Sequence, residues 1–275
     1  MKLTEQQKKF FDTFGYLVLP GAMSDSVGWI IDEFESVFKS RADVVHDGSK
    51  RTMFPQSFID SNAKLCTLLD DPRIVGVCEG LMGEDFLYEG GDGNFYSGDT
   101  GWHSDIMPTV GMYKASRHIK IAFYLDALTR DTGALRVIPG SHLAGDTFAD
   151  TLQKEIWSLC DGKEMPSIAL ETKPGDLAIF HHNLKHASYG GSKRRRMFTM
   201  NLCAYPHTPQ ELAEIAAEMR WYGSQGAEKL HSETMLKTAS PARMKHLQPL
   251  HDLFGAVLIE ESAKAREKKR ALQPA

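Results

Sequence analysis

Hydrophobic residues in the first part of the chain recur at helical spacing, interrupted by one short apolar run. The first helical stretch opens at Thr4 and ends at Gly15, residue types favoured at helix N-caps and C-caps. The apolar run after it stops at Pro20 and Gly21, which favours a strand followed by a turn. The pattern predicts a helix over residues 3–15, a strand over 16–21, and helices over 23–43 and 62–82.

From about residue 86 onward, the pattern changes to short strand-like runs separated by glycine and proline turns. The clearest runs cover residues 118–128, 133–142, 175–182 and 196–206. Many short strands with such turns are typical of a sandwich or barrel. Residues 146–165 read as a helix inserted between two of these strands.

The chain becomes helical again after Pro206. Thr208, Pro209 and Glu211 form the signature of a capping box with proline at the first helical position. Residues 260–275 are highly charged and predict a surface helix or a frayed end. No repeat or flexible linker divides the sequence, so we expect one domain over residues 1–275, with a β core wrapped by N- and C-terminal helices.

Composition narrows the possible partners. The chain of 275 residues is 42% hydrophobic and 25% charged, with a formal net charge of −4. This mild acidity argues against nucleic acid or an anionic membrane as a partner, because both favour basic surfaces. No apolar run has transmembrane length and no secretory leader is evident, so a cytoplasmic protein is expected. Four scattered cysteines predict reduced, buried thiols rather than disulfides: Cys66, Cys78, Cys160 and Cys203.

A histidine and an aspartate two residues apart stand in the segment GWHSDIMP, residues 101–108. On a strand, His103 and Asp105 would point to the same face. A single pair of this kind is usually solvated, and a metal site with two histidines and one carboxylate needs another histidine. His181, His182 and His186 follow the apolar run at 175–180; the first two suit partly buried polar positions, and His186 is the candidate ligand.

The basic strand that follows supplies candidates for binding the carboxylate of a 2-oxo acid. Arginine suits a carboxylate because its planar guanidinium forms two parallel hydrogen bonds. Along a strand, Arg194 and Arg196 share one face and Arg195 points to the other, so at most one face reaches a pocket. The simpler interpretation is a solvated basic turn.

Taken together, these segments resemble the phytanoyl-CoA dioxygenase family of Fe(II)/2-oxoglutarate-dependent oxygenases. The resemblance covers most of residues 5–205; the helical extension from about 206 to 275 shares no recognisable motif. It rests on DTFGYLVLPGAMSD, GWHSD, YLDALTRDTGALRVIPGSH, KPGDLAIFHHNLKHAS and RRRMFTMNLCAY. It implies a double-stranded β-helix, the jelly-roll or cupin-like fold, as the core.

The resemblance also implies roles for single residues. His103, Asp105 and His186 would bind Fe(II). Arg195, or Arg196 if the strand register differs, would bind 2-oxoglutarate together with Ser188. The cosubstrates would be 2-oxoglutarate and O2, and the reaction would be hydroxylation of a small molecule. Related halogenases have a small residue in place of the carboxylate, so Asp105 favours hydroxylation or another oxidation.

The sequence alone does not decide several features of the expected pocket. Asn94 or Tyr96 could replace a lysine that some family members carry before the metal motif. Lys120 could face the pocket and bind an anionic substrate or the cosubstrate, but an outward orientation is the one expected. Trp102 with Met107 could form a wall beside the metal. The alternatives are a cupin-like metal enzyme that does not use 2-oxoglutarate, and a barrel that binds a small molecule without catalysis. The oligomeric state is undecided.

Overall fold

Two antiparallel sheets form the centre of the protein. A computed structural model describes residues 1–41, 45–54, 57–106, 114–143, 162–191 and 193–271. The larger sheet has the order β1-β9-β6-β11-β4-β2, with β3 also paired to β11. Its strands are β1 (Tyr16–Leu19), β2 (Thr52–Phe54), β3 (Leu87–Gly90), β4 (Gly93–Tyr96), β6 (His118–Tyr124), β9 (Leu177–His181) and β11 (Arg195–Cys203).

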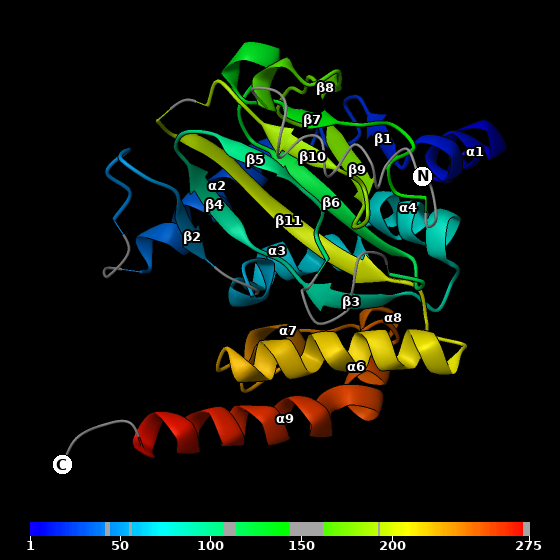
Figure 1. The fold of residues 1–275 in the computed structure, drawn as a ribbon, viewed down its shortest axis with the longest axis vertical. Helices are drawn as coiled ribbons and strands as arrows, with labels where there is room; N and C mark the ends of the chain where they lie inside the picture. The colour runs from blue at the N-terminus through cyan, green and yellow to red at the C-terminus, as the bar shows by residue number, and fades with distance from the viewer. Residues whose placement is uncertain (42–44, 55–56, 107–113, 144–161, 192, 272–275) are drawn as a thin grey trace.

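The smaller sheet closes over one face of the larger one (Figure 1). Its order is β5-β10-β7-β8, and its strands are β5 (Thr100–His103), β7 (Leu135–Val137), β8 (Ile168–Leu170) and β10 (His186–Ser188). Every strand pair in both sheets is antiparallel. Two facing antiparallel sheets with this connectivity confirm the predicted jelly-roll core.

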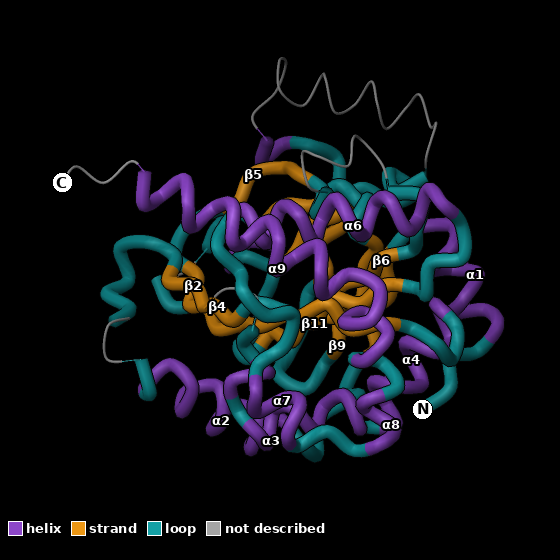
Figure 2. Tube along the Cα trace, turned by 90° about the horizontal axis from the view of Figure 1, so that it is seen from below, coloured by secondary structure: helices purple, strands orange, loops and turns teal. Residues whose placement is uncertain are grey.

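Helices cover the other face of the larger sheet (Figure 2). These are α1 (Glu5–Phe14), α2 (Val27–Lys39), α3 (Ala63–Cys66) and α4 (Pro72–Met82). Alternation along β6 explains the contact: Ile119, Ile121 and Phe123 belong to the main hydrophobic core shared with these helices. The intervening residues of β6 therefore point toward the smaller sheet.

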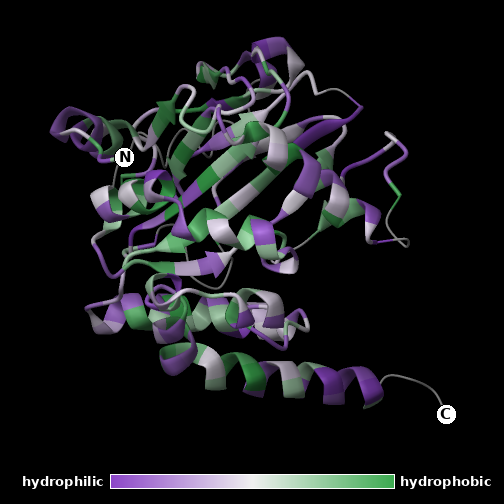
Figure 3. Cartoon of the chain, turned by 180° about the vertical axis from the view of Figure 1, so that it is seen from behind, coloured by the Kyte–Doolittle hydropathy of each residue, from purple (hydrophilic) through white to green (hydrophobic). Residues whose placement is uncertain are grey.

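Two of the C-terminal helices, α6 (Pro209–Ser224) and α9 (Gln248–Ala271), pack together along the edge of the larger sheet near β3 (Figure 1). The two short helices between them, α7 (Glu233–Lys237) and α8 (Pro241–Met244), lie in the helical layer beside α3 (Figure 2). Leu87 and Cys203 of the sheet pack against Ile215 and Met219 of α6. The hydrophilic end of α9 is visible in Figure 3, and the helical alternative for the charged tail is confirmed as far as Ala271.

Local capping signals were reliable guides to the helix ends. Thr4 caps α1, and Gly15 ends it with a φ of 80°, a left-handed conformation that glycine adopts without strain. The capping box of Thr208 and Glu211 at the start of α6 is confirmed. The helix predicted over 62–82 is instead broken into short pieces before α4, because Asp71 caps a new helix that starts at Pro72.

Two further expectations concern the inserted helix and the cysteines. Most of the helix predicted over 146–165 lies outside the described residues; Gly162–Glu164 form a short 3-10 turn. Cys66, Cys78 and Cys203 are buried free thiols, and Cys160 lies outside the described residues. In the described part of the chain, no helix is both long and apolar enough to cross a membrane.

Candidate metal centre and cosubstrate pocket

The smaller sheet brings two distant histidines together beside an aspartate. His103 ends β5 and His186 begins β10, and these two residues are direct partners in the antiparallel register. His103 Nε2 lies 3.9 Å from Asp105 Oδ1, and His186 Nε2 lies 3.6 Å from Asp105 Oδ2. Two imidazoles and one carboxylate on one side of an ion form the facial arrangement of non-haem Fe(II) enzymes.

Both histidines present a metal-binding nitrogen to this site. Nδ1 of His103 lies 2.8 Å from the Gly101 carbonyl, and Nδ1 of His186 lies 2.9 Å from the Leu184 carbonyl. A carbonyl only accepts hydrogen bonds, so the proton belongs on Nδ1 and each Nε2 keeps its lone pair. Burial lowers the pKa of His186 to about 3, which keeps this ring neutral and able to bind a metal.

Asp105 is held as a carboxylate by its surroundings. Burial raises its pKa, but the Lys120 ammonium and the nearby histidines lower it more, so the net pKa lies well below the ordinary value. Lys120 Nζ forms an ion pair with Asp105 Oδ2 at 2.9 Å. The expected outward direction of Lys120 is therefore wrong: the lysine lies on the cavity face of β6, opposite the apolar face that packs on the helices.

A buried arginine faces the same cavity. Arg195 is only 2% exposed, and its Nη2 donates to Ser188 Oγ at 3.1 Å. Its Nε and Nη1 have no hydrogen-bond partner among the described residues, although buried guanidinium groups are normally paired. A carboxylate placed in the cavity would accept hydrogen bonds from this guanidinium and supply a partner that it lacks.

The neighbouring arginines point the other way, as the strand alternation predicts. Arg196 binds Asp126 Oδ1 at 2.6 Å and Glu35 Oε1 at 3.1 Å. Arg194 also pairs with Glu35, at 2.9 Å. Both are occupied by acidic partners outside the cavity, which leaves Arg195 as the arginine of this strand that lines it.

The cavity between the sheets has a volume of about 480 Å³. Sequence reasoning missed several of its walls, because they come from distant segments. Arg51, next to β2, lies 3.1 Å from Asp92 and stacks over Tyr96. Trp221 and Tyr222 of α6 also line the cavity, so the C-terminal extension builds part of the site.

The remaining candidates have mixed positions. Tyr96 lines the cavity, and Asn94 accepts a hydrogen bond from Arg51 at 2.6 Å. Trp102 packs beside Tyr189 and donates to the Gly162 carbonyl rather than forming a metal-site wall, and Met107 lies outside the described residues. The His182 carbonyl accepts a hydrogen bond from the Asp105 backbone N–H at 2.8 Å, so His182 supports the position of Asp105.

A double-stranded β-helix carrying two histidines, a carboxylate and an unpaired buried arginine in one cavity defines the class of Fe(II)/2-oxoglutarate-dependent oxygenases. The family model for phytanoyl-CoA dioxygenase (PhyH) matches residues 11–197, more than half of the sequence. The chain belongs to this family, whose members use Fe(II), 2-oxoglutarate and O2.

Individual relatives agree with this assignment. A 2-aminoethylphosphonate dioxygenase from uncultured bacterium HF130_AEPn_1 is 26% identical over 230 residues, which cover 71% of this chain and 80% of that protein. Apo EctD from S. alaskensis matches with a TM-score of 0.57 and 20% identity, over 77% of this chain and 78% of that chain. Iron-bound HygX from Streptomyces hygroscopicus matches with a TM-score of 0.59 and 18% identity, over 76% of this chain and 89% of that chain. At such identities these structures show a shared fold.

Proposed function

We propose that His103, Asp105 and His186 hold Fe(II), and that Arg195 with Ser188 holds the far carboxylate of 2-oxoglutarate. The observation that carries this proposal is the buried Arg195 guanidinium, whose Nε and Nη1 lack hydrogen-bond partners among the described residues. A buried, unsatisfied cation is costly unless a ligand completes it. The protonated Nδ1 atoms of both histidines support the metal part of the proposal.

Each residue has a definite task in this arrangement. The two imidazoles and the Asp105 carboxylate fix the coordination geometry, and Lys120 holds Asp105 in place through its ion pair. Arg195 and Ser188 orient the cosubstrate so that its keto-acid end reaches the metal. When bound, Fe(II) with 2-oxoglutarate and O2 supplies the oxidising power that hydroxylates the substrate and releases succinate and CO2.

The substrate that fits the remaining space is a small anion. Three cationic side chains and two carboxylates line the cavity: Arg51, Lys120, Arg195, Asp92 and Asp105. Bound Fe(II) and the 2-oxoglutarate dianion cancel in charge, so the loaded cavity retains one positive charge for the substrate. Its volume of about 480 Å³ must hold both cosubstrate and substrate, which favours a small molecule.

The C-terminal helices belong to the same functional unit in this proposal. Trp221 and Tyr222 of α6 line the cavity and would contact the substrate. We therefore treat residues 1–275 as one catalytic domain. The relative that acts on 2-aminoethylphosphonate makes this compound the first to test.

The test is formation of succinate by the Fe(II)-loaded protein with 2-oxoglutarate and O2. We expect 2-aminoethylphosphonate or another small phosphonate, phosphate ester or carboxylate to raise succinate formation above the substrate-free rate. Ethylamine, which lacks the anionic group, serves as the matched control and should give no increase. Stimulation by neutral or cationic compounds but by none of the anions would contradict the substrate class. Absence of any Fe(II)-dependent succinate would favour the cupin-like enzyme or the non-catalytic barrel.

A further inference from the structure

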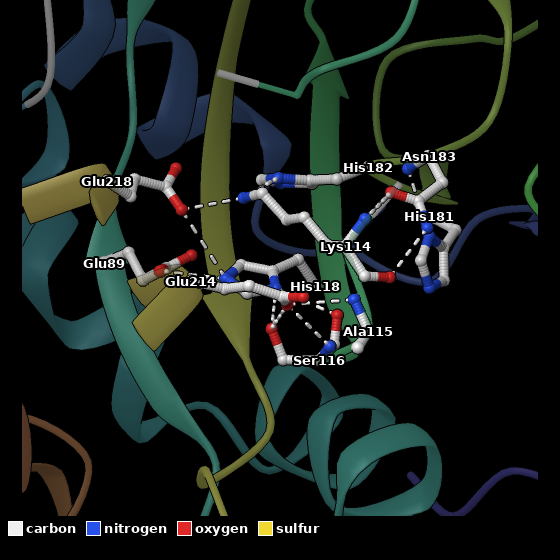
Figure 4. Close-up of polar contacts among 10 residues, drawn as sticks. All are labelled: Glu89, Lys114, Ala115, Ser116, His118, His181, His182, Asn183, Glu214 and Glu218. Carbon is white, nitrogen blue, oxygen red and sulfur yellow. Dashed lines mark hydrogen bonds and ion pairs between the residues drawn. The ribbon is translucent and has the colours of Figure 1, made fainter. Parts of the chain in front are cut away.

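A second group of metal-binding side chains lies away from the iron site, between the larger sheet and α6. Glu89 of β3, His118 of β6 and Cys203 of β11 place a carboxylate oxygen, an imidazole nitrogen and a sulfur within 4.8 Å of one another. Cys203 is the direct register partner of His118 across the two strands. The Glu89 and His118 side chains are 2% and 0% exposed, and Cys203 is fully buried (Figure 4 shows Glu89 and His118).

The orientation of His118 matches that of both histidines in the iron site. Its Nδ1 lies 3.1 Å from the carbonyl of Ser116, two residues earlier, as His103 faces the Gly101 carbonyl and His186 the Leu184 carbonyl. The Ser116 hydroxyl, also 3.1 Å from Nδ1, can accept as well. Proton placement on Nδ1 leaves a lone pair on Nε2.

That lone pair faces other acceptors. His118 Nε2 lies 3.2 Å from Glu89 Oε1 and 3.6 Å from Glu218 Oε2. Neither Glu89 oxygen, nor His118 Nε2, has a hydrogen-bond partner of good geometry among the described residues. Acceptors this close together in a dry interior repel each other unless a proton or a metal cation lies between them.

We propose that this cation is Zn²⁺, bound by Glu89, His118 and Cys203 as a structural site. Thiolate, imidazole and carboxylate are the ligands zinc takes in proteins, at about 2.0–2.3 Å in tetrahedral geometry. Tetrahedral ligands at such bond lengths lie roughly 3.3–3.7 Å apart, close to the 3.2 Å between Glu89 and His118. Glu218 Oε2, which lies 3.6 Å from His118 Nε2, is our candidate for the fourth ligand.

The charges of the surrounding residues agree with this occupant. Lys114 Nζ binds Glu218 at 2.7 Å and so balances one of the two buried carboxylates (Figure 4). A zinc ion with a Cys203 thiolate adds one positive charge, which balances Glu89.

The position of the site gives it a structural consequence. It joins three strands of the larger sheet, and the Lys114–Glu218 pair connects it to α6. The same helix carries Trp221 and Tyr222 on the wall of the cavity. Zinc at this site therefore fixes the helix that shapes the substrate end of the pocket, at a distance from the iron ligands.

Cobalt distinguishes this site from the iron site, because a thiolate bound to Co²⁺ gives an intense near-ultraviolet charge-transfer band and the iron triad contains no sulfur. We would titrate metal-free protein with Co²⁺, using the parent, His186→Ala, Cys203→Ser and, as a matched buried-cysteine control, Cys78→Ser. The band is expected in the parent, His186→Ala and Cys78→Ser, and absent in Cys203→Ser. After Zn²⁺ loading and dialysis, His186→Ala should retain one zinc ion per chain, and the His186→Ala, Cys203→Ser double variant none.

The parent and His186→Ala measurements stand even if Cys203→Ser folds poorly, and Glu89→Gln provides a second variant that leaves every cysteine in place. Glu89→Gln is expected to weaken Co²⁺ binding at least tenfold with the far-ultraviolet circular dichroism unchanged. No thiolate band in folded parent protein, together with no zinc retained by His186→Ala, would overturn the proposal. His118 would then belong to a plain buried ion-pair cluster with Glu89 and Glu218.

Discussion

Replacing Arg195 with glutamine should weaken 2-oxoglutarate binding far more than the same change at Arg196. The two residues are adjacent on β11 and point to opposite faces. Arg195 lines the cavity, is 2% exposed and has two nitrogens without partners among the described residues. Arg196 is already paired with Asp126 and Glu35.

The expected size of the effect follows from this burial. Removing one partner of a buried, hydrogen-bonded charge pair costs about 2–5 kcal/mol. That range corresponds to a dissociation constant raised roughly 30-fold to several thousand-fold. Without ligand, Arg195→Gln should not lower the melting temperature, because it removes a buried charge that lacks full pairing. Arg196→Gln breaks partly exposed ion pairs and should cost about 1 kcal/mol of stability or less.

The assay is isothermal titration of 2-oxoglutarate into Ni²⁺-loaded protein, in which no turnover occurs. Arg196→Gln is expected to keep the dissociation constant of the parent within a factor of about three. Arg195→Lys retains the charge but not the two-pronged contact, and should fall between the parent and Arg195→Gln. Equal binding by Arg195→Gln and the parent would refute the assignment of this arginine.

Three more predictions follow from the same geometry. A Cβ at Gly133, whose φ is 97°, would lie 1.5 Å from Arg195 Nη1, so Gly133→Ala should weaken 2-oxoglutarate binding about tenfold or more in the same titration; unchanged binding would contradict this. Trp221→Ala should raise the KM of a substrate found by the succinate assay while leaving 2-oxoglutarate binding intact; loss of both would contradict a role in the substrate wall. Burial lowers the pKa of His231 to about 4, below its ordinary value of about 6.5, so the neutral ring adds stability that is present above pH 6.5 and lost as the pH falls toward 4, by up to ~3 kcal/mol. In urea unfolding at a series of pH values, the free energy of unfolding of His231→Gln should fall less steeply with decreasing pH than that of the parent. Parallel pH dependences would contradict this role of His231.

Short-range spacing and the family resemblance together selected the candidate metal and cosubstrate residues. His103 and Asp105 are two apart at the end of a strand, and strand alternation separates Arg195 from its neighbours. The choice of Arg195 over Arg196, and of His186 as the second histidine, came from the resemblance. The structure adds what the spacing could not give: His186 lies directly opposite His103 across β5 and β10.

The cavity walls could not be predicted in the same way. Arg51, Asp92 and Trp221 are far apart in sequence and meet only because β2, β4 and α6 surround one end of the cavity. We expected Lys120 to point outward because a lysine on a strand normally points to water. Its burial is compensated by the Asp105 carboxylate, which follows β5, whereas Lys120 lies on β6. Contacts between segments far apart in the sequence determine these positions, and the local residue pattern does not predict such contacts.

The most direct test of the account is anaerobic spectroscopy. Fe(II) and then 2-oxoglutarate are added to metal-free protein, and the weak visible charge-transfer band of an iron-chelated keto acid is recorded. The account predicts this band in the parent, its loss in His186→Ala, and a higher 2-oxoglutarate concentration for half-maximal intensity in Arg195→Gln but not in Arg196→Gln. A folded, iron-loaded parent protein that shows no band at saturating 2-oxoglutarate would contradict the proposed site.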